Sequence, residues 1–213
     1  MNNELNLEIR KASLEDDLLR IAELLYKTDP YIYPYWFETL DKCTEELSKL
    51  LQEDKFIFNI GNIYIAIDKE ENEIAGLVCA IDTEAELDYD YTELKNRNER
   101  YKFTIENYIL PLIEEVKDAE YVYISNVCVH EEYRGKHVGN SLLKHIIEHY
   151  RENLTNTIVL DVIENNVNAV KLYEKLGFFQ EGDLYKGFSS PTEERPNVFS
   201  MKTEPKKEEI IWE

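Results

Sequence analysis

The alternation of apolar and polar residues near the start of the chain predicts a strand followed by two helices. Residues 5–9 alternate between apolar and polar side chains, which is the period of a half-buried strand. Ser13 precedes acidic residues and apolar positions at helical spacing, which predicts an N-capped amphipathic helix ending near Lys27. Segment 31–37 is too rich in proline and aromatic residues to form a helix interior. A second helix is predicted over residues 44–51.

The middle of the chain predicts a hairpin, a helical insertion and a central strand. Residues 63–67 and 74–81 are apolar runs separated by a polar turn, which is typical of two hairpin-connected strands. Residues 83–117 are polar, acidic and helix-prone, with Pro111 as an expected interruption. Residues 121–129 form the longest run of β-branched and aromatic side chains, which favours a central strand.

The last third of the chain alternates between predicted helices and strands. These elements are a helix over 142–150, a strand over 158–162, a helix over 167–176 capped by Gly177, and strands at 178–179 and 197–201. The whole order predicts one mixed α/β domain, an α+β arrangement around a mixed sheet. We expect this domain to cover residues 1–202 and a charged C-terminal tail to cover residues 203–213.

Composition and charge narrow the classes of protein that the chain can belong to. Hydrophobic residues make up 43% of the 213 residues, which is enough for a core and argues against global disorder. The 44 acidic and 24 basic residues give a formal net charge of −20. This charge argues against nucleic acid and anionic membranes as general partners, because both require a basic surface. No apolar run approaches the roughly 18 residues of a membrane-spanning helix.

The N-terminus and the cysteines predict a cytoplasmic protein without a metal site. The first residues lack the basic and apolar regions of a signal peptide. Cys43, Cys79 and Cys128 are odd in number and widely spaced. They therefore fit neither a disulfide framework nor a metal-binding knuckle.

A short segment after the predicted central strand carries the residues of an anion-binding loop. Arg134, Gly135, Lys136 and Gly139 lie between that strand and the start of an amphipathic helix. Backbone N–H groups at a helix start have no partner within the helix and carry partial positive charge, so they bind phosphate well. The glycine patterns of the P-loop and of dinucleotide-binding folds are both absent. These residues alone leave open an ordinary glycine turn with solvated basic side chains.

A second segment, about thirty residues later, completes a pair of family motifs. Residues 166–178 read Asn-x-x-Ala-x-x-Leu-Tyr-Glu-Lys-x-Gly-Phe, and residues 134–139 follow the pattern Arg/Gln-x-x-Gly-x-Gly/Ala except at one position. In this order the two motifs resemble those of the GNAT superfamily of CoA-dependent N-acyltransferases. The resemblance covers roughly residues 121–182 and implies the family fold, a mixed and mostly antiparallel sheet flanked by helices. His137 replaces the first glycine of the pattern, and a positive φ there would cost histidine a modest strain.

The resemblance implies that the chain binds acetyl-CoA as its co-substrate. The pyrophosphate would lie on the amides of residues 134–140, and the pantetheine arm would pair with the exposed edge of the preceding strand. The implied CoA-binding residues are Val127, Cys128, Val129, Arg134, Gly135, Lys136, His137, Val138, Gly139, Asn140, Asn166, Ala169 and Tyr173. Asn166 has a helix cap as its alternative role. A nucleophilic role for Cys128 is disfavoured, because cysteines in strands are usually buried and inert.

The resemblance assigns Tyr173 the role of the general acid that protonates the departing CoA thiolate. Core packing is the alternative for this residue, since the chain has 15 tyrosines. The sequence does not identify a general base, because the strand ending at Val129 lacks a carboxylate. The acidic candidates that lie elsewhere are Asp82, Glu84, Glu86 and Asp88.

An aromatic segment after the first predicted helix is the candidate wall of the acceptor site. Its residues Tyr31, Tyr33, Trp36 and Phe37 could form a pocket for an amine or an apolar acceptor, with core packing as the alternative. The implied activity is transfer of an acetyl group from acetyl-CoA directly to a primary amine of a small molecule or peptide. A non-catalytic acyl-CoA sensor or scaffold and a homodimer both stay open.

Overall fold

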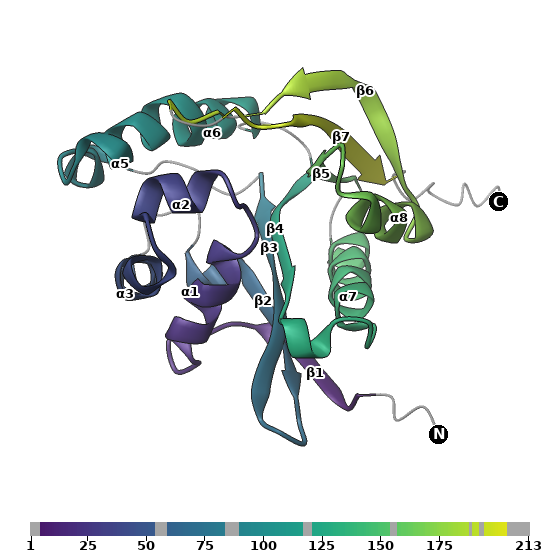
Figure 1. The fold of residues 1–213 in the computed structure, drawn as a ribbon. Coiled ribbons are helices and arrows are strands. Elements are labelled where there is room, and N and C mark those ends of the chain that lie inside the picture. Colours follow the sequence, from purple (N-terminus) through teal and green to yellow (C-terminus); the bar gives the residue numbers. More distant parts are fainter. Residues whose placement is uncertain are drawn as a thin grey trace.

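A seven-stranded sheet with helices on both faces forms the centre of the protein (Figure 1). The computed structural model describes residues 5–53, 59–83, 90–116, 121–153, 157–187, 189–191 and 194–203. The strands are β1 (Leu7–Lys11), β2 (Ile63–Asp68), β3 (Glu73–Asp82), β4 (Val122–Val129), β5 (Ile158–Ile163), β6 (Phe178–Lys186) and β7 (Asn197–Thr203). Their order across the sheet is β1-β2-β3-β4-β5-β7-β6, and β4–β5 is its parallel pair.

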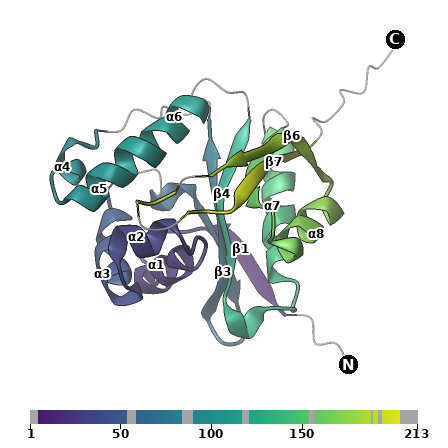
Figure 2. The same ribbon diagram turned by 45° about the horizontal axis from the view of Figure 1, so that its top comes forward.

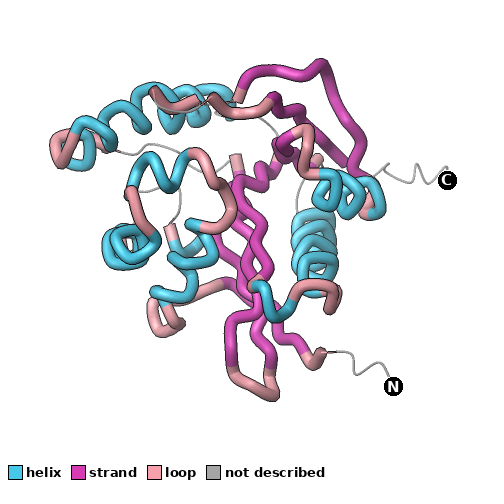
Figure 3. The backbone as a smooth tube through the Cα atoms, in the orientation of Figure 1, coloured by secondary structure: helices cyan, strands magenta, loops and turns pink. Residues whose placement is uncertain are grey.

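The helices divide between the two faces of the sheet, with α1, α2 and α3 on one face and α7 and α8 on the other (Figures 1 and 3). A separate arm of short helices lies at the end of the sheet where β4 begins (Figure 2). The helices are α1 (Leu18–Tyr26), α2 (Ile32–Phe37), α3 (Leu40–Leu50), α4 (Thr92–Lys95), α5 (Glu99–Thr104), α6 (Leu110–Val116), α7 (Val138–Asn153) and α8 (Val167–Lys175). A π-helical turn over Ile105–Ile109 joins α5 to α6.

The core lies in two layers because the central strand β3 is buried on both faces. Leu77 and Cys79 pack in the cluster that includes α1, α2 and α3. Val78 and Ala80 pack in the opposite cluster, which includes the apolar face of α7. A strand covered by helices on both sides has no solvent-facing side, which explains its almost continuous apolar sequence.

The predicted mixed sheet and its strands are confirmed, although several elements start earlier or end later than their apolar patterns. Helix α3 begins at Leu40, because the Thr39 hydroxyl accepts a hydrogen bond from the Lys42 amide at 3.3 Å and caps the helix. Helix α7 begins at Val138, before its first full apolar turn. Residue 203 ends β7, and the predicted tail beyond it lies outside the described residues.

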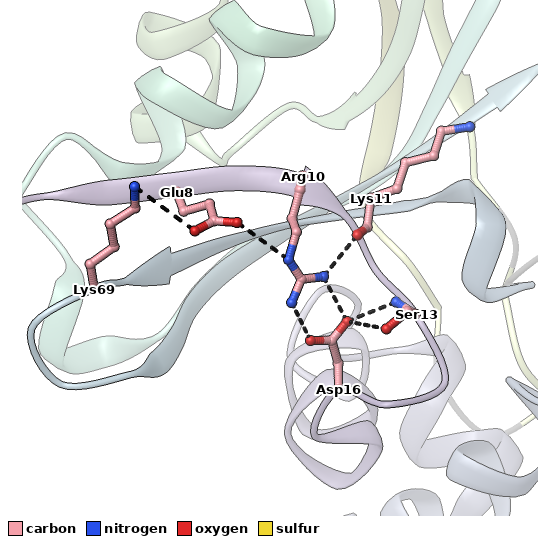
Figure 4. A network of polar contacts seen from close by, with 6 residues as sticks. All are labelled: Glu8, Arg10, Lys11, Ser13, Asp16 and Lys69. Carbon is pink, nitrogen blue, oxygen red and sulfur yellow. Dashed lines mark hydrogen bonds and ion pairs between the residues drawn. The ribbon is translucent and has the colours of Figure 1, made fainter.

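The predicted cap at Ser13 is wrong, because residues 13–16 form a separate polar turn (Figure 4). Asp16 accepts two hydrogen bonds from the Arg10 guanidinium, at 2.8 and 2.5 Å, and one from the Ser13 amide at 2.7 Å. The Arg10 contact lowers the pKa of the Asp16 carboxyl. Helix α1 instead starts after Asp17, whose side chain accepts from the Arg20 amide at 3.0 Å.

The exclusion of a helix from residues 31–37 is also wrong, since α2 occupies most of this segment. Pro34 lies in the first turn of α2, where a backbone N–H would have no partner within the helix, so the proline costs no hydrogen bond there. The Asp29 carboxylate accepts from the amides of Tyr31 and Ile32 at 2.8 and 2.9 Å and stabilises the helix start.

The interruption expected at Pro111 takes the form of a π-helical turn rather than a break. Pro111 is the second residue of α6, and this helix directly follows the turn over Ile105–Ile109. Proline has no N–H for an i→i−4 hydrogen bond, and a wider turn before it accommodates the missing bond and the ring. The insertion therefore continues as one helical arm from α5 to α6.

Gly76 allows β3 and β4 to approach closely, which leads to a prediction about stability. A Cβ at this position would lie 2.7 Å from the Cys128 carbonyl oxygen and 3.3 Å from the Val129 Cα. We expect Gly76→Ala to lower the free energy of unfolding by about 1–3 kcal/mol in urea denaturation, because backbone must move. Gly61→Ala is the matched control, because its nearest neighbour is the Asn59 side chain. Equal stability of the two variants would contradict this account.

Candidate active site

Strands β4 and β5 pair over only three residues and then separate, which opens the sheet at its centre. Residues Val122–Ile124 pair with Ile158–Leu160, and β5 pairs with β7 over residues 159–163. Strand β3 continues along the other edge of β4 as far as Val129. The edge of β4 that faces away from β3 therefore has no strand partner after residue 124.

The pairing of β3 with β4 determines which backbone groups point to this open edge. The His130 amide donates to the Ala75 carbonyl at 2.9 Å, and Val129 lies opposite Gly76. Residues of antiparallel strands alternate between pairs that exchange hydrogen bonds and pairs that do not. The N–H and C=O groups of Val127 and Val129 are thus directed away from β3, toward the open edge.

A first cavity, of about 590 Å³, lies along this edge of β4. Its walls come from the end of β4, from the loop before α7 and from α8. Of the residues expected to bind CoA, the following line it: Val127, Cys128, Val129, Arg134, Gly135, His137, Val138, Gly139, Asn140, Asn166, Ala169 and Tyr173. Lys136 does not line it, and its Nζ lies 5.1 Å from the centre of the Tyr133 ring.

The loop before α7 gives this cavity an anion-binding end. Gly135 and His137 have φ angles of 74° and 66°, so the histidine occupies the left-handed conformation that the glycine pattern suggested. Residues 138–140 form the first turn of α7, whose N–H groups have no partner within the helix. The basic residues in the wall are Lys27, Arg134 and Lys175, and no described residue of the wall is acidic.

A second cavity, of about 620 Å³, lies on the other side of the gap between β4 and β5. The turn between α1 and α2, the arm α5–α6, and the ends of β6 and β7 surround it. Of the four aromatic residues expected in an acceptor wall, Tyr33 and Trp36 line this cavity. Phe37 stacks on Trp36 with ring centres 5.0 Å apart, and Tyr31 lies 6.0 Å from the Arg195 guanidinium.

Tyr173 belongs to the walls of both cavities, together with Thr28, Val127 and Asn166. The side chain of Tyr173 is 8% exposed, and its burial raises the pKa of the phenol to about 12. Asn166 accepts a hydrogen bond from the Ala169 amide at 3.3 Å and caps α8, which fixes the start of the helix that carries Tyr173. Tyr173 therefore lies where the two cavities adjoin.

A hydrogen-bond network holds the turn after α1 against β4 at the junction of the cavities. The Asn126 side chain donates to the Thr28 hydroxyl at 2.7 Å and accepts from the Ser125 hydroxyl at 2.9 Å. Asn126 is 7% exposed, so its amide would be costly to bury without these partners. The network therefore holds Thr28, which belongs to both cavity walls, against β4.

The second cavity has charged groups of both signs, and its cations are already paired. The Arg195 guanidinium contacts the Asp29 carboxylate at 2.6 Å, and Lys186 contacts Glu194 at 2.6 Å. Asp161 accepts hydrogen bonds from the hydroxyls of Tyr123, at 2.9 Å, and Ser200, at 2.6 Å.

Asp161 is a candidate functional residue that reasoning from the sequence did not identify. It alternates with the buried residues Leu160 and Val162, and such a polar position in a strand usually faces solvent. The sequence feature that could have identified Asp161 is that it is a carboxylate in the strand directly before the second motif. Of the acidic candidates named earlier, Asp82 lines neither cavity, and Glu84, Glu86 and Asp88 lie outside the described residues.

The cysteines are buried and free of disulfides. Burial raises the pKa of the Cys128 thiol to about 11, which keeps it protonated near neutral pH and disfavours a nucleophilic role. No group of three or more potential ligand side chains within the described residues is placed to hold a metal ion. In the same part of the chain, no helix has the length and apolar character needed to cross a membrane.

Comparison with protein families supports the resemblance of the two motifs. The model of the acetyltransferase (GNAT) family matches residues 25–178, which include both walls of the gap between β4 and β5. The chain is 36% identical over 64 residues to spermine/spermidine N(1)-acetyltransferase of Bacillus subtilis, which is 30% of this chain and 42% of that protein. It is 30% identical over 76 residues to ribosomal protein bS18-alanine N-acetyltransferase of Escherichia coli. This match covers 36% of this chain and 51% of that protein. The matches thus span about half of these relatives or less.

Solved structures show the same fold over almost the whole chain. An N-acetyltransferase from Staphylococcus aureus matches 92% of this chain and 100% of its own, with a TM-score of 0.63 and 21% identity. A GNAT family acetyltransferase from Elizabethkingia anophelis, solved with acetyl-CoA bound, matches 93% and 98%, with a TM-score of 0.54 and 18% identity.

Gly139 offers a test of the first cavity as the CoA site. A Cβ here would lie 3.3 Å from Val129 Cγ2 and 3.5 Å from Leu172 Cδ2, so a larger side chain fills space between β4 and α8. We expect Gly139→Val to weaken CoA binding at least tenfold, or about 1.4 kcal/mol, in isothermal titration calorimetry. The unfolding midpoint is measured alongside. Unchanged affinity in a folded variant would exclude this cavity as the CoA site.

Proposed function

The chain belongs to the GNAT acetyltransferase family, and from this premise we propose that it transfers the acetyl group of acetyl-CoA to a primary amine. The observation that carries the proposal is the position of Tyr173 in the shared wall of the two cavities. One cavity lies beside the anion-binding loop and the other contains the carboxylate of Asp161. This arrangement suits a reaction between two substrates that enter from opposite sides.

Acetyl-CoA occupies the first cavity in this proposal. Its pyrophosphate binds the free amides at the start of α7, where Arg134 and Lys175 add positive charge. Its pantetheine arm pairs with the open edge of β4, because the backbone groups of Val127 and Val129 are directed there. The thioester then reaches the junction at Tyr173.

The acetyl transfer is one acyl substitution at the thioester carbon. The acceptor nitrogen forms the new C–N bond, the C–S bond breaks, and the Val129 amide stabilises the negative charge that develops on the carbonyl oxygen. The thiolate leaves with the proton of the Tyr173 hydroxyl. An acceptor that binds as an ammonium group first loses one proton to water and attacks as the neutral amine. The nitrogen then loses a second proton to the carboxylate of Asp161, which the hydroxyls of Tyr123 and Ser200 hold in place, and Tyr173 regains its proton from solvent.

The acceptor is an amine of a small molecule or of a peptide in this proposal. The relatives include enzymes for spermine or spermidine and for the alanine of a ribosomal protein. Both kinds of acceptor carry an amine. A cationic acceptor fits a cavity in which the carboxylates of Asp161 and Glu115 have no basic partner among the described residues.

The Tyr173→Phe variant tests the catalytic role directly. We expect kcat to fall by about a hundredfold or more, because a general acid is removed while the ring that packs in the core is kept. CoA affinity is expected to stay within about threefold, since the hydroxyl is not required for the pyrophosphate contacts. Turnover is measured by thiol release with a panel of amines and N-terminal peptides.

Tyr150→Phe is the matched control for this variant. Tyr150 is 7% exposed, lies on α7 and belongs to neither cavity wall. We expect this variant to keep wild-type turnover. Equal turnover of the two variants would overturn Tyr173 as the general acid and keep the acetyltransferase. Binding of CoA without turnover on the whole panel would favour a non-catalytic acyl-CoA sensor over an acetyltransferase.

The pH dependence of kcat provides a separate check on Tyr173. A phenol donates a proton only below its pKa, and burial raises that of Tyr173 to about 12. The donor therefore stays protonated where an ordinary tyrosine, with a pKa of about 10, begins to ionise. We expect no fall in kcat between about pH 8 and about pH 10 in stopped assays. A fall in kcat in this range, with the protein still folded, would contradict Tyr173 as the proton donor.

A further inference from the structure

Two carboxylates in the second cavity have no ion-pair partner among the described residues. Asp161 is held by hydroxyl groups, and within the described residues no basic side chain forms an ion pair with Glu115. The cations of the same wall, Arg195 and Lys186, already contact Asp29 and Glu194. In the part of the chain that the structure describes, the cavity therefore keeps two negative charges without a paired cation.

The two carboxylates come from different parts of the fold. Asp161 lies on β5, which pairs with β4 at the start of the gap that leads to Tyr173. Glu115 lies near the end of α6, on the helical arm at the end of the sheet where β4 begins (Figure 1). Glu115 is exposed, as expected for a residue at a cavity mouth, so a ligand can reach it.

The two charges act on each other. Partial burial and the negative charge of Asp161 both raise the pKa of the Glu115 carboxyl. Two negative charges in one cavity repel each other, and bound cations remove this repulsion. One ammonium group compensates one carboxylate, and a second ammonium group on the same molecule is needed to compensate both.

The aromatic part of the same cavity wall suits the chain that would link two such cations. Trp36, Tyr33 and Phe103 contribute aromatic rings to it. Aromatic faces attract ammonium groups and pack against methylene groups. The cavity volume of about 620 Å³ also exceeds what a single small amine requires.

We propose that Glu115 is a specificity-determining residue that binds the distal ammonium group of a linear diamine or polyamine, while Asp161 holds the reacting amine. This inference rests on the proposed function and names the substrate class of the same cavity. A peptide N-terminus supplies a single ammonium group followed by neutral backbone, so it would leave Glu115 uncompensated. An acceptor with a carboxylate at the same distance would be repelled.

The test compares putrescine with butylamine, which share a carbon chain and differ by one ammonium group. Both turnover and equilibrium binding to the CoA-bound full-length protein are measured at low salt, because salt screens charges at an exposed site. The variants are Glu115→Gln, Asp161→Asn and, as the matched control, Glu114→Gln. Glu114 is the exposed neighbour of Glu115 and does not line the cavity.

We expect the wild type to prefer putrescine by about tenfold in kcat/KM, which corresponds to about 1.4 kcal/mol. Glu115→Gln is expected to remove this preference mainly through KM, whereas Glu114→Gln keeps it. Asp161→Asn is expected to reduce kcat for both amines, because it acts on the reacting group.

The outcomes separate this inference from the proposed function. Turnover of both amines with a putrescine preference that Glu115→Gln leaves intact, or with no preference in the wild type, would overturn the role of Glu115 and keep the acetyltransferase. Binding of putrescine that depends on Glu115, without turnover of either amine or of the amine and peptide panel, would support diamine recognition and overturn the acetyltransferase. Absence of both Glu115-dependent binding and turnover on that panel would overturn both.

Discussion

The separation of β4 from β5 after three paired residues is the constraint on which the site depends. A continuous parallel ladder would satisfy the edge of β4 within the protein and leave no path through the sheet. Because β5 turns toward β7 instead, the backbone of Val127 and Val129 faces an open edge, and a cavity lies on each side of the passage. Tyr173, on α8, lies in the wall that the two cavities share.

The two cavities carry charges of opposite sign, although the chain as a whole has a net charge of −20. The described wall beside the α7 loop holds Lys27, Arg134 and Lys175 and no carboxylate. The opposite cavity holds Asp161 and Glu115, which have no basic partner among the described residues. An anionic ligand and a cationic ligand are therefore favoured on opposite sides of Tyr173.

Two predictions from the local sequence are wrong because a residue outside the predicted element forms the deciding hydrogen bond. Residues 31–37 form a helix because Asp29 caps it and because Pro34 falls in the turn that needs no donor. Ser13 lost its expected capping role because Arg10, from the adjacent strand, holds Asp16 in a turn of its own. In both cases the outcome was decided by a hydrogen bond to a residue outside the predicted element.

The sequence by itself determined the positions of the strands, the glycine loop before α7 and the helix of Tyr173, because each depends on local periodicity and turn residues. The resemblance of its two motifs to a known family supplied the mixed sheet, whose strand pairs join residues far apart in the chain. The sequence could not place Asp161 or Glu115, since a single acidic residue on a strand or a helix is typical of a solvated surface. Only the tertiary structure decided that α6, β5 and the turn after α1 surround one cavity. The reason is physical: cavities arise where strands separate and where distant segments pack, and neither event leaves a periodic pattern in the chain.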